Sequence, residues 1–161
     1  MGFELFINIH LKSAILRYKI EEPTTMDAIK CKALKLELES LPPRDAVVQI
    51  DRFFDGNDDP ASIGCNLSEH PGIEAFRRAL TALLSHRDVE AVYARIAEID
   101  PGNDSWPFTD TVFIVGTILI DELREVLATL HPDEIEPGEQ FEVPSSISAK
   151  HRAPVLAAWW D

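Results

Sequence analysis

The segment that follows residue 50 concentrates the polar side chains most able to do chemistry. Residues 51–67 read DRFFDGNDDPASIGCNL and include four aspartates, two asparagines and a cysteine. Counted from Asp55, acidic or amide residues stand at the first, third and fifth positions of an EF-hand loop. Proline at the sixth position and asparagine at the twelfth break that pattern. We therefore predict a tight turn whose polar side chains bond the local backbone. An irregular cation site using Asp55, Asp58 and Asp59 is the alternative.

The cysteine of this segment, Cys65, precedes His70 by five residues. A catalytic thiol needs a base within hydrogen-bond reach, and His70 or Asp110 could supply it. The competing interpretation is a buried, unreactive thiol, because free cysteine is among the most buried residue types. The sequence favours the unreactive thiol.

A second loop, WPFTD at 106–110, places two aromatic residues beside an acid. Exposed aromatic residues next to charges are typical of a binding hot spot. The alternative is a loop anchored to the core by both aromatic residues, Trp106 and Phe108, with Asp110 capping or bonding a turn, and aromatic burial favours that alternative.

Other catalytic or metal signatures are absent from the sequence. The five histidines are scattered, with no HxxH, HxH or HExxH, so we predict no metal centre. The phosphate-binding P-loop, the dinucleotide motif GxGxxG and the hydrolase motif GxSxG are also missing. We predict no cofactor.

Charge is the strongest compositional signal. The net charge is −13, and residues 98–142 contain twelve acids and one base, Arg124. Phosphate contacts require Lys and Arg, so nucleic acid is a poor partner. An acidic surface can attract a basic protein. The competing interpretation is a solvated surface that keeps the protein soluble.

The cellular location follows from the cysteines and the apolar runs. Two cysteines without a CxxC spacing indicate reduced thiols in the cytoplasm. The N-terminus lacks the basic region of a signal peptide, and the longest apolar run, residues 112–120, is too short for a membrane helix. We expect a cytoplasmic protein with no membrane contact.

The elements that must position these residues alternate along the chain. Apolar spacing and turn residues predict the following elements: strands at 3–10 and 14–20, a helix at 27–40, a strand at 46–54, a helix at 68–85, a strand at 111–116, a helix at 119–130 and a last strand within 152–161. Residues 27–40 also alternate like a strand, and 88–100 fits helix or strand. The Trp159–Trp160 pair predicts a C-terminus docked into the body.

This mixed order predicts an α+β protein. We expect a single domain over residues 1–161, with a mostly antiparallel or mixed sheet and two or three helices packed on one face. In the first of those helices, Ile29, Ala33, Leu36 and Ser40 share one face, which we expect to point inward.

Four segments together resemble a small bacterial family of uncharacterised proteins: FFDGNDDPASIGCNL, WPFTDTVFIV, LHPDEIEPG and a terminal WWD. They lie within residues 46–161. The resemblance brings no assigned activity. Size and acidity are similar in character to those of immunity proteins of toxin systems, an analogy that says nothing about fold.

The sequence thus predicts a non-enzymatic, immunity-like binding protein. Its acidic, aromatic-containing face would consist of the loops 55–66, 100–110 and 131–142 and would contact a basic protein. The candidate binding residues are Asp55, Asn57, Asp58, Asp59, Cys65, Asn66, Asp104, Trp106, Asp110, Asp133, Glu134 and Glu136. The alternative is a small enzyme or metal-binding protein, in which the Asp55–Cys65 loop meets Asp110 across one cleft.

Overall fold

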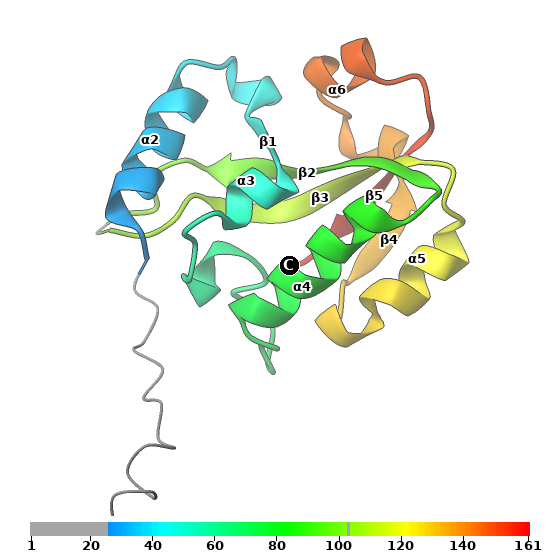
Figure 1. The fold of residues 1–161 in the computed structure, drawn as a ribbon, viewed down its shortest axis with the longest axis horizontal. Helices are drawn as coiled ribbons and strands as arrows, with labels where there is room; N and C mark the ends of the chain where they lie inside the picture. The colour runs from blue at the N-terminus through cyan, green and yellow to red at the C-terminus, as the bar shows by residue number, and fades with distance from the viewer. Residues whose placement is uncertain (1–25, 103) are drawn as a thin grey trace, which may run out of the picture.

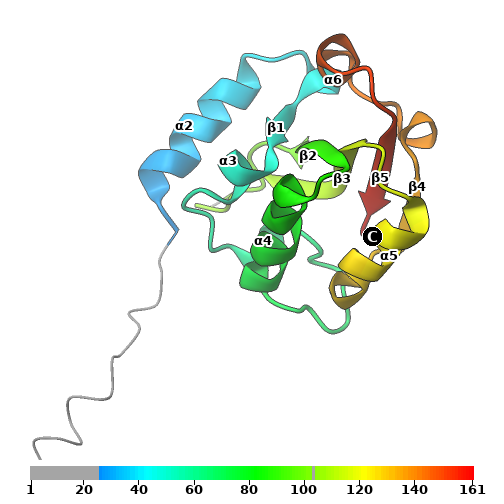
Figure 2. The same cartoon turned by 45° about the vertical axis from the view of Figure 1, so that its right-hand side comes forward.

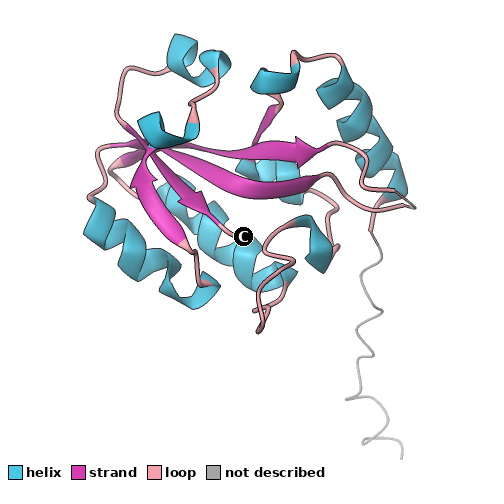
Figure 3. Cartoon of the chain, turned by 180° about the vertical axis from the view of Figure 1, so that it is seen from behind, coloured by secondary structure: helices cyan, strands magenta, loops and turns pink. Residues whose placement is uncertain are grey.

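The fold is built on one antiparallel sheet. The computed structural model describes residues 26–102 and 104–161, so the strands expected at 3–10 and 14–20 lie outside the described residues. Within them, five strands pair in the order β1-β2-β3-β5-β4, and every pair is antiparallel. The strands are β1 (Val47–Gln49), β2 (Val89–Glu98), β3 (Phe108–Gly116), β4 (Glu134–Pro137) and β5 (Val155–Trp159). They converge near one end and fan apart toward the other (Figure 3).

Helices connect and cover these strands. They are α2 (Ala28–Glu39), α3 (Ile50–Phe54), α4 (Ile73–Ala82), α5 (Ile120–Leu127) and α6 (Ser145–Lys150). Five 3₁₀ turns accompany them: η1 (Pro43–Asp45), η2 (Pro60–Ser62), η3 (Leu83–Ser85), η4 (Ala128–Leu130) and η5 (Gly138–Phe141). The α+β class with an antiparallel sheet is therefore confirmed.

The central strand β3 divides the core into two layers. Because successive side chains of a strand point to opposite faces, Val112 and Ile114 join the main apolar cluster. Phe113 and Val115 join a smaller cluster on the other face. All four side chains are fully buried, so this strand is covered on both sides.

The two faces carry different helices. The three longest of the described helices, α2, α4 and α5, contribute side chains to the main cluster, together with α3. The smaller cluster contains Ile147 of α6. Figures 1 and 2 show α4 and α5 along one side of the sheet and α6 on the opposite side.

Two ambiguous segments are resolved by the structure. The first is helix α2, whose N-cap is Asp27: its Oδ1 accepts hydrogen bonds from the backbone N–H groups of Ile29 and Lys30, both at 3.1 Å. Residues 89–98 form strand β2, which pairs with both β1 and β3.

Only the first part of the strand predicted at 46–54 is correct, because residues 50–54 form a helix. Alternating burial holds from Ala46 through Val48 to Ile50, but helix α3 begins at Ile50. From there Ile50, Phe53 and Phe54 are buried at the three- and four-residue spacing of a helix. At Ile50 the spacing of buried residues changes from the two-residue period of a strand to that of a helix. Both β1 and α3 therefore contribute side chains to the main cluster.

Other boundaries also differ from expectation. The helix predicted at 68–85 begins only at Ile73, after Gly72 with φ +92°. The segment 131–142, expected to be a loop, contains strand β4, and α6 was not expected. In the described residues, no helix is both long enough and apolar enough to cross a membrane.

Candidate functional site

The aspartate-rich loop begins at the end of α3 and is tied to α2. Asp55 Oδ1 lies 2.6 Å from the Nζ of Lys30, and both side chains are about half exposed. The hydrogen bond from Lys30 holds the pKa of Asp55 below its usual range and raises the pKa of Lys30. Asp55 is therefore already paired with a cation of the chain.

Two further residues of this loop bond the local backbone, as predicted for a tight turn. Asn57 is fully buried; its Oδ1 accepts the N–H of Asp59 at 3.0 Å, and its Nδ2 donates to Ser62 Oγ at 3.0 Å. Asp59 Oδ1 accepts the N–H of Ala61 at 2.9 Å. The guanidinium of Arg77 donates to the Asn57 carbonyl. Asn57 and Asp59 thus have structural partners within the protein.

The thiol of this loop is exposed, contrary to the expected burial. Cys65 lies at the surface and its Sγ is 3.7 Å from Asn66 Oδ1. His70 Nδ1 accepts the N–H of Gly72 at 2.9 Å, so Nε2 carries the proton and donates to the Ile63 carbonyl at 2.8 Å. Both ring nitrogens of His70 are therefore bonded to the backbone, and His70 is not available as a base for Cys65.

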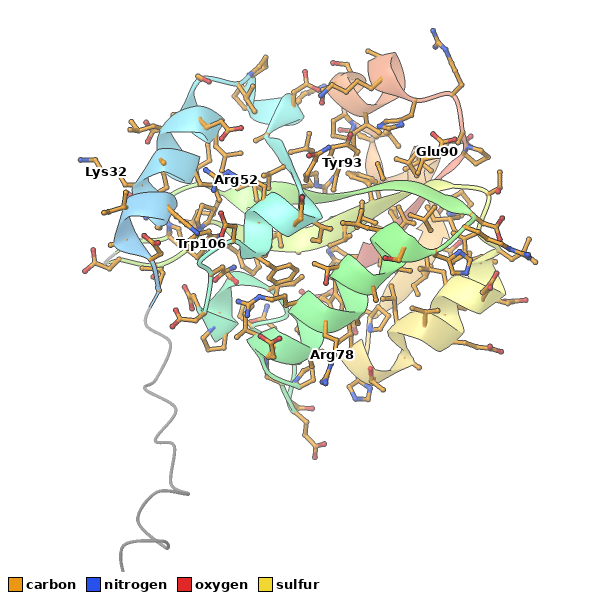
Figure 4. The ribbon with its side chains drawn as sticks, in the orientation of Figure 1. Lys32, Arg52, Arg78, Glu90, Tyr93 and Trp106 are labelled. Atoms are coloured by element: carbon orange, nitrogen blue, oxygen red, sulfur yellow. The ribbon has the colours of Figure 1, made fainter. Side chains whose placement is uncertain are left out.

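The second loop lies beside the first. Asp59 Oδ2 accepts the backbone N–H of Trp106 at 3.0 Å, and Ile63 forms a bridge with Thr109. The Trp106 side chain is fully buried in the main cluster (Figure 4). The favoured interpretation, a loop anchored to the core, is confirmed for Trp106, whereas Phe108 is only half-buried. Trp106 is therefore not a surface contact residue, because a ring of this size gains more from core burial. Asp104, two residues earlier, is exposed, with φ +59°.

The third loop reaches the same end of the sheet through the C-terminal segment. The N–H of Trp160 donates to the Asp110 carbonyl, and the N–H of Asp133 donates to the Trp159 carbonyl, both at 2.9 Å. Asp133 Oδ2 accepts the N–H of Asp161 at 2.8 Å. The Asp110 carboxylate accepts the Thr111 hydroxyl at 2.7 Å and lies 3.7 Å from Arg95.

An acidic groove runs between α5 and the edge strand β4. It encloses about 570 Å³, and its polar lining consists of Arg124, His131, Asp133, Glu134, Glu136 and Gln140. The cation Arg124 lies 3.0 Å from Asp121 and 3.9 Å from Glu136, and donates to the Ile135 carbonyl at 3.3 Å. This guanidinium links α5 to β4. Three predicted residues, Asp133, Glu134 and Glu136, meet here.

The structure also shows a hydrogen-bonded chain of three side chains, Tyr93, His151 and Glu90, that no sequence pattern predicted. We refer to it as the relay. The Tyr93 hydroxyl lies 2.9 Å from His151 Nε2, and His151 Nδ1 lies 3.3 Å from Glu90 Oε2. A carboxylate can only accept, so Nδ1 carries the proton and Nε2 accepts the tyrosine hydroxyl. Tyr93 and Glu90 lie on β2, 58 or more residues from His151, so no sequence spacing signalled this contact (Figure 4).

A histidine and two carboxylates also cluster near the start of β2. In the described part of the chain, His86, Asp88 and Glu122 are the one group of three whose ligand atoms lie within 4.8 Å of one another. His86 Nδ1 accepts the N–H of Asp88 at 3.2 Å, so Nε2 is protonated and donates to Glu122 at 3.2 Å. A metal-binding histidine points an unprotonated ring nitrogen at the metal and donates its other N–H to a second group. In His86 one ring nitrogen already accepts a backbone N–H and the other already donates to Glu122. The arrangement fits a hydrogen-bonded cluster.

Comparison with known proteins places the chain in a family. No curated protein and no solved structure matches it. Residues 27–158 match the family described as Uncharacterized protein YfbO family, which confirms the expected kinship with an uncharacterised family. The match spans α2 to β5 and so includes the sheet, the acidic groove and the relay. Because it covers most of the chain, the protein belongs to the YfbO family.

Proposed function

We propose that this protein is a non-enzymatic binding protein that presents an acidic surface to a basic protein partner. In this respect it would be similar to immunity proteins of toxin systems. The observation that carries the proposal is the groove between α5 and β4, where a carboxylate of each element approaches the same cation, Arg124. We define the acidic face as residues 121–142.

The charge of this face supports attraction of a basic partner. Residues 121–142 contain eight acids, one arginine and no lysine. The arginine is already paired with Asp121 and lies near Glu136. Clustered charges of one sign raise the rate at which an oppositely charged protein is encountered, and a nucleic acid would be repelled by the same charges.

The position of the face in the fold adds two binding features. Among the strands of the described residues, β4 is the last in the sheet order, and an edge strand leaves backbone groups that a partner can pair with. On α5 the apolar side chain of Val126 is 39 % exposed, and Leu119 just before the helix is 71 % exposed. Interfaces commonly combine a small apolar centre with a charged rim. The aromatic ring of Trp106 is not part of this face.

The proposed location is the cytoplasm. Cys31 and Cys65 are both free in the structure, and reduced thiols are typical of that compartment. The enzyme alternative is not adopted, because Asp55, Asp59 and His70 are bonded to other groups of the protein.

The test reverses the charge of the groove. The variant Asp133→Lys/Glu134→Lys/Glu136→Lys is compared with wild type and with Glu39→Lys/Glu69→Lys/Glu98→Lys. The control has the same charge change on exposed acids that bond no other side chain within the described residues. All three are used as affinity baits at low and at physiological ionic strength.

We expect a basic protein to bind wild type and control but not the groove variant. Higher salt should weaken the binding, because exposed charges are screened over about 8 Å at physiological ionic strength. Capture of the same partners by all three baits would contradict the proposal.

A further inference from the structure

A buried hydroxyl without a partner marks a second site at the β1 edge of the sheet, far from β4 in the strand order. The Oγ of Ser146, in α6, is buried and has no hydrogen-bond partner in the described part of the chain. Leaving a buried donor unsatisfied costs about 1–3 kcal/mol, so an orphaned hydroxyl needs an explanation. Rotation of the Ser146 side chain about χ1 would turn this hydroxyl toward the cleft that the residue lines, where a bound ligand would supply the missing partner.

This serine lines a cleft, which we name the β1–α6 cleft. It encloses about 450 Å³, within the range of small-molecule sites. Its polar walls are formed by Glu37, Asp45, Gln49, Arg52, Tyr93 and Lys150, together with Ser146. Apolar side chains of β1 and α6, Val47, Val48 and Ile147, complete the lining.

Two donors of this cleft have no partner in the described part of the chain, and a third forms only long ion pairs. Lys150 makes no hydrogen bond or ion pair with any described residue, and neither does the Gln49 side chain. Arg52 approaches Glu37 and Asp55 only at 3.9 Å, beyond hydrogen-bond distance. Lys150 and the Gln49 side chain are therefore available to a ligand, and Arg52 can still donate hydrogen bonds beside its two long ion pairs.

The acceptors are largely engaged or turned to solvent. Asp45 accepts the Ser145 hydroxyl at 2.9 and 3.0 Å and the N–H of Ser146 at 3.3 Å. The Glu37 side chain is 59 % exposed. The cleft thus has an excess of unused donors over unused acceptors, and the complementary ligand is rich in acceptor oxygens.

We propose that the β1–α6 cleft binds a small oxyanion, a carboxylate or a phosphate ester, through Lys150, Ser146 and Arg52. Tyr93 forms a rigid wall of the site, because its hydroxyl is held by His151, which Glu90 orients in turn. This site is independent of the acidic face, since it consists of other residues and would bind an anion, whereas the acidic face would bind a basic partner.

The test titrates inorganic phosphate and, separately, succinate into the full-length protein at low ionic strength. Amide chemical shifts in a ¹⁵N–¹H NMR spectrum follow Val48, Ser146 and Ile147. The variants are Lys150→Gln and Ser146→Ala, and the control is Lys32→Gln, an exposed lysine of α2 that contacts no carboxylate of a described residue. Ser146→Ala should fold normally, because it removes a hydroxyl that has no partner.

We expect saturable shifts confined to the cleft for at least one of the two anions. Lys150→Gln should weaken binding by about tenfold and Ser146→Ala by several-fold, with Lys32→Gln unchanged. Binding of phosphate alone or of succinate alone identifies which kind of oxyanion the site takes. The proposal is overturned if neither anion gives saturable shifts, or if the two cleft variants bind like wild type.

Discussion

At the residue scale, the two cysteines occupy contrasting environments. Cys31 is 4 % exposed, and its Sγ lies 3.5 Å from the Ser105 carbonyl. Burial raises the pKa of the Cys31 thiol, because a thiolate is penalised in an apolar environment. Cys65 lies exposed in the aspartate-rich loop. The two thiols should therefore differ strongly in reactivity.

We expect one thiol of the native protein to react quickly with a disulfide reagent and the other only after unfolding. The raised pKa of Cys31 lowers its thiolate content, and the exposed position of Cys65 gives the reagent access to it. The measurement is a stopped-flow thiol assay with and without guanidinium. Cys65→Ser should abolish the fast phase, whereas Cys31→Ser should leave it unchanged. A fast phase that persists in Cys65→Ser would contradict the assignment.

At the element scale, the inward face of α2 differs from the expected one. The sequence predicts that Ile29 and Leu36 point inward, but they are 84 % and 59 % exposed. Cys31, Leu34 and Leu38 are buried instead. Both sides of this helix carry apolar residues, so periodicity alone does not select one.

Two matched leucines of α2 provide a stability test. Leu34→Ala should lower the free energy of unfolding by about 2–5 kcal/mol, because it opens a cavity in the main cluster. Leu36→Ala removes the same atoms from a surface position and should change it by no more than about 0.5 kcal/mol. Chemical denaturation measures both. Equal losses would mean that the helix is rotated from the orientation described.

The ambiguity of residues 88–100 also has an element-scale cause. Strand β2 has register irregularities between Val89 and Ala91 and again around Ile96. An extra residue shifts the alternation, so Val89 and Val92 face the same cluster although they are three positions apart. A three-residue spacing of buried residues is also typical of a helix, so this spacing does not distinguish helix from strand.

At the scale of the whole molecule, Trp160 near the C-terminus contacts several elements of the fold. Trp160 is 1 % exposed, its ring lies 5.5 Å from that of Phe76 in α4, and its Nε1 donates to the Leu130 carbonyl at 2.8 Å. The docked C-terminus predicted from the tryptophan pair is thus confirmed. One side chain connects α4, η4 and the end of β5.

Trp160→Ala should therefore destabilise the whole fold by about 3–5 kcal/mol. The neighbouring Asp161→Ala keeps the backbone N–H that bonds Asp133 and should change stability by no more than about 0.5 kcal/mol. Thermal and chemical unfolding of both variants provide the measurement. Stability close to wild type in Trp160→Ala would contradict this role.

The sequence by itself determined those features that depend on neighbours along the chain. The α+β class, strand β3 and helix α5 follow from local periodicity, and the aspartate-rich loop is the tight turn that its Asp and Asn residues predict. Turn bonds join residues two to five positions apart, so their partners are visible in the sequence.

Tertiary structure alone decided the features that join distant segments. The relay of Glu90, Tyr93 and His151 depends on which face β2 turns to the core. The orphaned hydroxyl of Ser146 in α6 and the burial of Trp106 before β3 depend on how those segments pack against the sheet. A shift of one residue in register moves a side chain to the other face, and β2 shifts more than once. The contacts that form the two proposed sites therefore exist only in the folded sheet.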